Sequence, residues 1–317
     1  MSKTGYYTHP LCWKHEMGPG HPECPERLDA IQERLLITGV DLGLTALEAP
    51  PASPKVLALA HDPVYVDHLH ARAAQLREEQ DAGGPTYSHI DADTLMNIHT
   101  WEAALVSAGA AVAATDAVIR GELANAFCAV RPPGHHASVR EASGFCFFNN
   151  VAVAARYALE HHGLARVAVV DFDVHHGNGT EDIVAGDDRI LMVSFFQHPF
   201  YPEGGSQSNA ANLVNVPVPA YTKGMDIREI IEMMWIPRLE AFQPELILIS
   251  AGFDAHREDD MGQLGLVEQD YAWITMRMKD IAKRYAKGRI VSCLEGGYNL
   301  SSLARSVEAH LRALADV

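Results

Sequence analysis

The stretch Asp171-Phe172-Asp173-Val174-His175-His176-Gly177-Asn178-Gly179 follows directly on the apolar run Val167–Val170. Within it, Asp171, Asp173 and His175 are spaced two positions apart. Side chains of an extended chain alternate between two faces with a period of two, so these three groups point the same way. Two carboxylates and an imidazole on one face, at the carboxyl end of a buried strand, make a suitable site for a divalent metal ion. Such a buried cluster also needs a counter-charge, because an uncompensated charge away from water is very costly.

Apolar β-type runs alternate with helical patterns along the rest of the chain. The predicted strands are Lys3–Tyr7, Ala126–Val130, Arg166–Phe172, Ile190–Phe195, Leu246–Ser250 and Ile290–Leu294. The predicted helices are Pro25–Ile37, Trp101–Arg120, Asn149–His162, Asp226–Phe242, Glu268–Ala286 and Ser301–Ala315. The strands are continuously apolar, which is typical of a sheet covered on both faces. The alternation predicts a single α/β domain over residues 1–317, with a parallel, doubly wound sheet and long loops at Asp81–Asp93 and Gln197–Tyr221.

The unusual residues of the chain fall at the carboxyl ends of four predicted strands. They are Arg131-Pro132-Pro133-Gly134-His135-His136, the stretch Asp171–Gly179, Gly252-Phe253-Asp254 and Glu295-Gly296-Gly297-Tyr298. In an open parallel sheet, ligands bind outside the carboxyl ends of the strands. Two histidines, the Asp/His cluster, a further aspartate and a tyrosine are therefore expected at one rim.

Composition narrows the classes of partner. The 317 residues are 48% hydrophobic, and 41 acidic against 25 basic residues give a net charge of −16. This balance argues against direct nucleic-acid binding and favours cationic partners, although an acidic surface also serves solubility. Five cysteines without a CxxC spacing indicate reduced thiols, and the chain starts without an apolar segment. We expect a cytoplasmic protein without a membrane-spanning run, with the oligomeric state open and a homo-oligomer included.

These motifs resemble those of the zinc-dependent histone deacetylase superfamily. The resemblance also includes Gly144-Phe145-Cys146-Phe147-Phe148-Asn149-Asn150 and, near the start of the chain, Gly20-His21-Pro22-Glu23 and Pro25-Glu26-Arg27-Leu28. That superfamily includes class II histone deacetylases, bacterial histone deacetylase-like amidohydrolases and acetylpolyamine amidohydrolases. The resemblance covers nearly the whole chain in order. It implies the arginase–deacetylase α/β fold and a zinc-dependent amidohydrolase acting on linear amides.

The resemblance assigns one Zn²⁺ to Asp173, His175 and Asp254. Three protein ligands leave a coordination position open, as a catalytic zinc site requires. The family also implies a K⁺ ion beside the zinc, held through Asp171, Asp173, His175 and Ser194, partly by backbone oxygens.

The catalytic groups implied by the resemblance are His135, His136, Asp171, Asn178 and Tyr298. His136 is expected to act as general base and acid with Asn178 behind its ring, and His135 is expected to be tuned by Asp171. An asparagine at position 178, where class I members carry aspartate, indicates the class II branch. The Tyr298 hydroxyl is expected to stabilise the oxyanion.

The resemblance also predicts a narrow channel that grips a lysine-like methylene stem. Its implied walls are Gly144, Phe145, Met261 and one or both of Phe200 and Tyr201. Arg27 is expected beneath the metal, in a cavity that handles the acetate product. Asp91 and Asp93 are candidates for carboxylates at the rim, and His256 for a group near the site.

The main interpretation is therefore a lysine deacylase whose substrate is an acylated lysine peptide or protein. An acetylpolyamine amidohydrolase is the alternative within the family. A binuclear ureohydrolase of the arginase type would need an aspartate where this chain has Gly177. A non-catalytic acyl-amine binding protein would be expected to lose a catalytic histidine or tyrosine, whereas His135, His136 and Tyr298 are all present.

Overall fold

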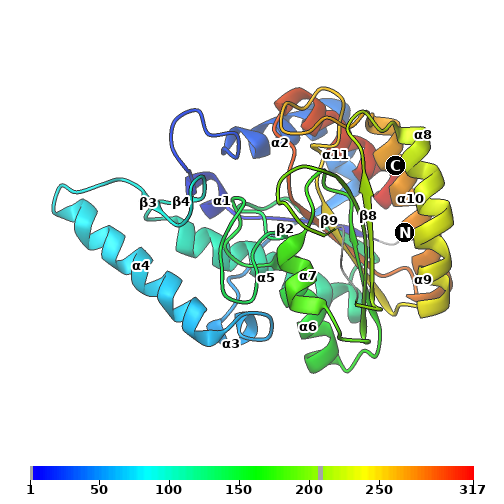
Figure 1. Ribbon diagram of the computed structural model, residues 1–317, viewed down its shortest axis with the longest axis horizontal. Helices are drawn as coiled ribbons and strands as arrows, with labels where there is room; N and C mark the ends of the chain where they lie inside the picture. Colours follow the sequence, from blue (N-terminus) through cyan, green and yellow to red (C-terminus); the bar gives the residue numbers. More distant parts are fainter. Residues whose placement is uncertain (1–2, 206–209) are drawn as a thin grey trace.

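An eight-stranded parallel sheet forms the centre of the computed structural model, which describes residues 3–205 and 210–317 (Figure 1). The strand order is β2-β1-β5-β10-β9-β6-β7-β8, and each neighbouring pair runs parallel. The strands are β1 (Thr4–Thr8), β2 (Leu44–Glu48), β5 (Asn125–Cys128), β6 (Val167–Asp171), β7 (Ile190–Gln197), β8 (Leu213–Val218), β9 (Leu246–Ala251) and β10 (Ile290–Leu294). A two-stranded hairpin of β3 (Ser88–His89) and β4 (Leu95–Met96) lies apart from this sheet. The parallel α/β architecture predicted from the sequence is confirmed.

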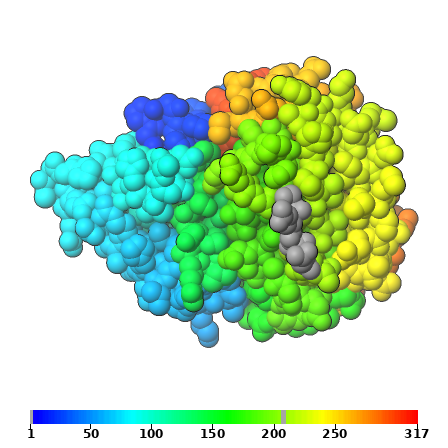
Figure 2. Space-filling view, in the orientation of Figure 1, coloured from blue at the N-terminus to red at the C-terminus, as the bar shows by residue number. Residues whose placement is uncertain are grey.

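Helices cover both faces of the sheet, which explains why β5, β6, β7, β9 and β10 are buried along their whole length. On one side lie α1 (Leu11–Lys14), α3 (Pro54–Leu57), α4 (Pro63–Asp81), α5 (Thr100–Ile119), α6 (Asn150–His162) and α7 (Asn178–Val184). On the other lie α2 (Glu26–Thr38), α8 (Gly224–Ile230), α9 (Ile236–Phe242), α10 (Glu268–Tyr285) and α11 (Leu300–Ala315). A 3₁₀ turn (Val40–Gly43) follows α2. Helix α4 and the segment after it project from the rest of the molecule (Figure 2).

Several elements were not predicted, including the short α1, α3 and α7 and the β3–β4 hairpin within and after the expected loop Asp81–Asp93. For three others the physical reason is clear. The expected loop Gln197–Tyr221 contains β8, an edge strand whose exposed Pro217 lacks a backbone donor; proline is tolerated in a sheet mainly at its edges. At the opposite edge, β2 is short and only partly buried, so its apolar signal is weak. Helix α4 is strongly charged, but Asp62 caps it by accepting a hydrogen bond from the Val64 amide (2.9 Å).

The predicted helix Asp226–Phe242 is interrupted by one stretch of π-helix. Helix α8 leads into a π segment at Ile231–Trp235, and α9 continues from it. Pro237 lies in the first turn of α9. Proline removes a backbone donor and clashes with the preceding turn, and widening that turn relieves the clash.

Helix α5 corrects the expectation that no run reaches membrane-spanning length. It has 20 residues with a mean hydropathy of 1.5, long and apolar enough to cross a bilayer. However, 67% of its apolar window is buried within the protein, where α5 packs against α6, β5 and β10. Its apolar character is thus accounted for by the core.

All five cysteines are free thiols, as expected.

A buried ionic cluster ties the N-terminal motifs to the sheet. Glu23, Arg27 and Arg131 are fully buried. Glu23 accepts from Arg27 Nη1 at 3.0 Å and from Arg131 Nη2 at 2.7 Å. Burial alone would raise the pKa of Glu23, but Arg131, with His15 and Arg27, holds that pKa well below its usual range. One carboxylate thus pairs with two guanidinium groups.

The substitution Glu23→Gln is expected to destabilise the protein by about 3–5 kcal/mol, because it leaves two buried guanidinium groups without a counter-charge. Urea unfolding measures the change. The control is Glu240→Gln, which breaks the exposed Arg284–Glu240 pair (2.6 Å) and should change stability by no more than about 0.5 kcal/mol. If the two variants lose similar stability, the buried cluster does not contribute to stability as proposed.

Candidate metal centre and active site

The four strands that precede the predicted motifs are the four central neighbours of the sheet. Their order is β5-β10-β9-β6. Because the strands are parallel, their carboxyl ends share one edge, and the motifs that follow them meet there.

Three side chains at this edge form a group suited to a metal ion. Donor atoms of Asp173, His175 and Asp254 all lie within 4.8 Å of one another, and all three residues are buried. His175 Nδ1 lies 3.0 Å from Asp173 Oδ1 and 3.2 Å from Asp254 Oδ2. Although it is buried, Asp254 Oδ2 accepts no hydrogen bond from the described part of the chain. Two carboxylates and one imidazole that converge in a buried site fit a divalent cation.

Backbone amides fix the remaining oxygens of the two carboxylates. Asp173 Oδ2 accepts from the Gly296 amide (2.8 Å), and Asp254 Oδ1 accepts from the Val174 amide (2.9 Å). A Cβ atom at Gly296 would lie 1.9 Å from Asp254 Oδ2, so position 296 requires glycine. Burial, together with the adjacent Asp173 charge, raises the pKa of Asp254 to about 7. Burial alone would lower the pKa of His175, yet the same two carboxylates raise it to about 10.

Position 177, where a binuclear ureohydrolase would need an aspartate, has no room for another ligand. A Cβ atom at Gly177 would lie 2.3 Å from Asp171 Oδ2 and 3.3 Å from His135 Nδ1. Any side chain here would displace Asp171. The geometry therefore disfavours a second metal beside the first.

The two neighbouring histidines differ in their partners. His135 Nδ1 lies 3.0 Å from Asp171 Oδ2, and His136 Nδ1 lies 2.7 Å from Asn178 Oδ1. Burial opposes a charge on either ring, but Asp173 and Asp171 raise the pKa of His135 to about 10. Burial and the nearby His135 and His175 hold the pKa of His136 well below its usual range. His136 is therefore a neutral imidazole whose Nδ1–H donates to Asn178.

Tyr298 follows β10 at the same edge. Its backbone amide donates to Asp259 Oδ2 (2.6 Å), and Gly297 before it has a φ of 119°, a conformation that favours glycine. Burial and Asp254 raise the pKa of the Tyr298 hydroxyl well above its usual value, so the hydroxyl keeps its proton. Arg27 lies under this loop, with its guanidinium carbon 5.0 Å from the centre of the Tyr298 ring and its Nε donating to the Gly297 carbonyl (2.7 Å).

A pocket of about 240 Å³ leads to this group. It is lined by Asp93, His136, Gly144, Phe145, His175, Phe200, Tyr201, Asp260, Met261 and Tyr298. All five residues predicted for the channel wall are therefore present, with both Phe200 and Tyr201 among them. Asp260 also lines the pocket; the sequence has three acids at 258–260, any of which could reach the rim, and does not distinguish among them.

Aromatic rings line two sides of the pocket. Phe200 stacks on His175 with ring centres 5.5 Å apart, and the Tyr201 ring meets the edge of His136 at 5.2 Å. Phe145 meets Tyr298 edge-on at 5.9 Å. Phe145 has a φ of 70°, unusual for a residue with a side chain, and its amide is held by Thr94 Oγ1 at 3.0 Å. This strained position fixes the ring at the wall.

Two buried acids position the site and were not assigned to it from the sequence. Glu295 Oε2 accepts from the amides of Gly134 (2.6 Å) and His135 (3.1 Å), so it fixes the histidine turn. Asp259 accepts from the amides of Tyr298 and Met261 (2.9 Å), which joins two walls of the pocket. Glu295 belongs to the quoted motif, but nothing in the sequence signals that its side chain turns back toward His135.

Two residues that were weaker candidates for the site, His256 and Asp91, do not line the pocket. The Nδ1 atom of His256 accepts from the Glu258 amide, and its Nε2 lies 3.5 Å from Glu268, so its ring is not part of the pocket. Asp91 Oδ1 accepts from the Asp93 and Thr94 amides and stabilises its own loop. The residues predicted for K⁺ do lie together, since Asp171 and Ser194 are partners across β6 and β7.

Comparison with known proteins identifies the class. The histone deacetylase domain family matches residues 21–314. The chain is 35% identical to the histone deacetylase-like amidohydrolase of Pseudomonas aeruginosa, over 94% of this chain and 82% of that protein. It is 37% identical to the polyamine deacetylase HDAC10 of Mus musculus, over 90% of this chain and 43% of that protein. The solved HD domain of HDA15 has a TM-score of 0.91 at 33% identity, covering 99% of this chain and 88% of that one.

The chain belongs to the histone deacetylase family. It is an enzyme of this hydrolase family, whose members include deacetylases and amidohydrolases, so the non-catalytic interpretation is set aside.

The metal group leads to a direct prediction. Protein purified by gel filtration should retain one tightly bound divalent ion per chain, and Asp173→Ala should lose it, because two donors and one neutralising charge are then insufficient. Elemental analysis measures the ion. The control is Asp188→Ala, at a carboxylate outside the group in the turn before β7. Two tightly bound ions per wild-type chain, both lost in Asp173→Ala, would favour the ureohydrolase interpretation instead.

Proposed function

We propose that residues 1–317 act as one catalytic domain, a zinc-dependent deacylase that removes acetyl or acyl groups from lysine ε-amines. The observation that carries this proposal is the position of the group Asp173–His175–Asp254 beside a pocket with aromatic walls. Such walls suit a methylene stem and exclude water. The net charge of −16 favours approach of a lysine-rich substrate.

His136 is proposed as the group that moves the proton. Its Nδ1–H is engaged with Asn178 Oδ1, so Nε2 carries the lone pair that can accept a proton from water. The lowered pKa of His136 keeps this ring neutral at pH 7. The same nitrogen would return the proton to the leaving amine. His135, with its proton held toward Asp171, is proposed to orient water and to balance charge.

The bound metal would supply Lewis-acid activation of the scissile carbonyl and of water. Tyr298 is proposed to donate its hydroxyl to the carbonyl oxygen as negative charge develops. The raised pKa of Tyr298 is consistent with this role, because only the protonated phenol is a donor. Arg27 holds the tyrosine loop through the Gly297 carbonyl, so it is proposed to act by positioning as well as by lining a product cavity.

We also propose the K⁺ site of the family for this chain. Asp171 and Ser194 lie beside each other on β6 and β7. The Ser194 hydroxyl already donates to Asn215 Oδ1 (3.0 Å), so the serine would contribute its backbone oxygen. A cation there would offset part of the buried carboxylate charge.

The substitution Tyr298→Phe is expected to lower the turnover number on an acetyl-lysine peptide by about 10²–10³-fold, because one donor to the oxyanion is lost. His136→Ala should lower it at least as much. Both variants should keep their metal. Tyr221→Phe, at a 75% exposed tyrosine, is the control. A turnover near that of the wild type in either variant would remove that residue from the mechanism.

An acetylpolyamine amidohydrolase is the second candidate. Two carboxylates, Asp93 and Asp260, line the pocket and could meet the distal ammonium of a polyamine. Glu258, by contrast, is engaged with Arg305 at 2.7 Å. The relative in mouse is named a polyamine deacetylase. Met261 is an apolar residue of the same wall, and it favours the main interpretation, a lysine deacylase.

We therefore expect a higher kcat/KM for an acetyl-lysine peptide than for acetylspermidine or acetylputrescine. Steady-state rates measured side by side on these three substrates decide the point. A kcat/KM on the acetylated polyamines equal to or above that on the peptide would contradict the expectation. In that case Asp260→Asn and Asp93→Asn identify the carboxylate responsible, with Glu258→Gln as the matched control.

A further inference from the structure

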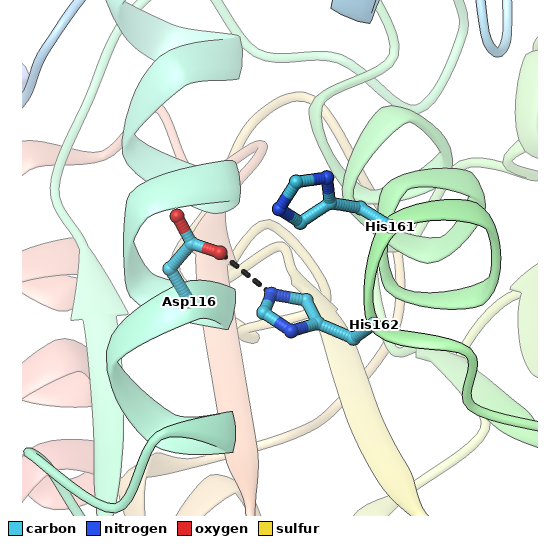
Figure 3. A group of neighbouring side chains, drawn as sticks. All are labelled: Asp116, His161 and His162. Carbon is cyan, nitrogen blue, oxygen red and sulfur yellow. Dashed lines mark hydrogen bonds and ion pairs between the residues drawn. The ribbon is translucent and has the colours of Figure 1, made fainter.

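A second group of metal-ligating side chains lies between α5 and α6. Asp116 comes from the last turns of α5, and His161 and His162 end α6. Donor atoms of the three residues lie within 4.8 Å of one another. Figure 3 shows both imidazole rings reaching from α6 toward the Asp116 carboxylate.

The contacts of this group leave ligand atoms available. His162 Nε2 lies 2.6 Å from Asp116 Oδ1. The described residues offer no hydrogen-bond partner to the His161 nitrogens; this ring stacks on Tyr157, with ring centres 4.7 Å apart, and meets His162 edge-on at 5.1 Å. One nitrogen of His161 is turned toward the Asp116 side (Figure 3). The exposed Arg120 lies 3.6 Å from Asp116 Oδ2, leaving Oδ1 to the histidine side.

This group is separate from the catalytic edge of the sheet. Helix α5 leads into the start of β5, and α6 leads into the start of β6. Their C-terminal ends therefore lie at the amino edge of the sheet, whereas Asp173, His175 and Asp254 lie at the carboxyl edge. An ion bound between α5 and α6 would not contact the substrate.

We propose that Asp116, His161 and His162 bind a divalent transition metal ion of the Zn²⁺ type. Two imidazoles and a carboxylate favour such an ion over Ca²⁺ or Mg²⁺, which prefer oxygen donors. Donors on one zinc ion are about 3.4 Å apart in a tetrahedral site. The contact of 2.6 Å between His162 Nε2 and Asp116 Oδ1 would have to widen to this value. The exposed His161 ring would have to turn so that one of its nitrogens, now within 4.8 Å of the other donors, approaches to it. Water would supply the remaining positions.

The chemical consequence is a link between two helices that meet only through side chains. The ion takes the place of the proton shared by His162 and Asp116, and it adds His161 to the contact. Because the folded chain holds the three ligands together and the unfolded chain does not, the ion binds the folded state more tightly. It therefore stabilises that state by an amount that rises with the logarithm of the ion concentration. The three ligands of this site are partly or fully exposed, whereas those of the catalytic centre are buried, so the ion binds more weakly here and is removed by gel filtration.

Gel-filtered holoenzyme is the material for the test. Zn²⁺ is added in equilibrium dialysis, bound zinc is counted by elemental analysis, and the melting temperature is followed in parallel. The wild type should take up one zinc ion beyond its tightly bound one and melt at a higher temperature. His161→Ala and Asp116→Asn should weaken this uptake by at least about tenfold and lose the rise in melting temperature. The control is His68→Ala, at an exposed histidine of α4.

Several outcomes would overturn the proposal. One is no additional zinc on the wild type, and another is equal uptake by the wild type and both variants. A third is a melting temperature that falls in Asp116→Asn while added zinc leaves that of the wild type unchanged. Asp116 and His162 would then form only an ion pair. Deacetylase rates measured without added zinc should be unchanged in all three variants, so the result does not depend on the proposed function.

Discussion

The structure depends on two carboxylates that are buried side by side. Asp173 and Asp254 follow the neighbouring strands β6 and β9, and neither reaches water. Two like charges in this position are unfavourable without a cation. His175 supplies part of the compensation, and the amides of Gly296 and Val174 supply more. Asp254 Oδ2 has the 3.2 Å contact with His175 but no hydrogen bond from an amide of the described chain, so the site is suited to a metal ion.

The surroundings of this pair follow from the same constraint. Position 296 is glycine because a side chain would collide with the carboxylates, and Gly177 leaves Asp171 in place beside His135. The different partners of His135 and His136 give two adjacent rings opposite shifts in pKa. Deeper in the protein, Glu23 with Arg27 and Arg131, and Glu295 with the histidine turn, hold the loops that carry these groups. Each side chain proposed as catalytic is thus fixed by a buried charged or polar neighbour.

Much of this arrangement could be predicted from the sequence, since it follows from short-range patterns. Continuous apolar runs locate the central strands, and parallel order brings the residues after them to one edge. What could not be predicted depends on long-range geometry or weak signals. Strand β8 contains Pro217 and lies at an edge, so its pattern resembles a loop. Asp116 and His162 are 46 positions apart in the chain, and no local pattern indicates that α5 and α6 bring them together.

X-ray absorption spectroscopy of the ion retained after gel filtration tests the central claim most directly. The spectrum reports the nearest donor atoms, and imidazole rings add a distinct scattering pattern from their outer atoms. The arrangement of Asp173, His175 and Asp254 predicts one imidazole, with oxygen donors completing the shell. Two or more imidazoles, or any sulfur donor, would contradict it, because this edge of the sheet would then not be where the tightly bound metal resides.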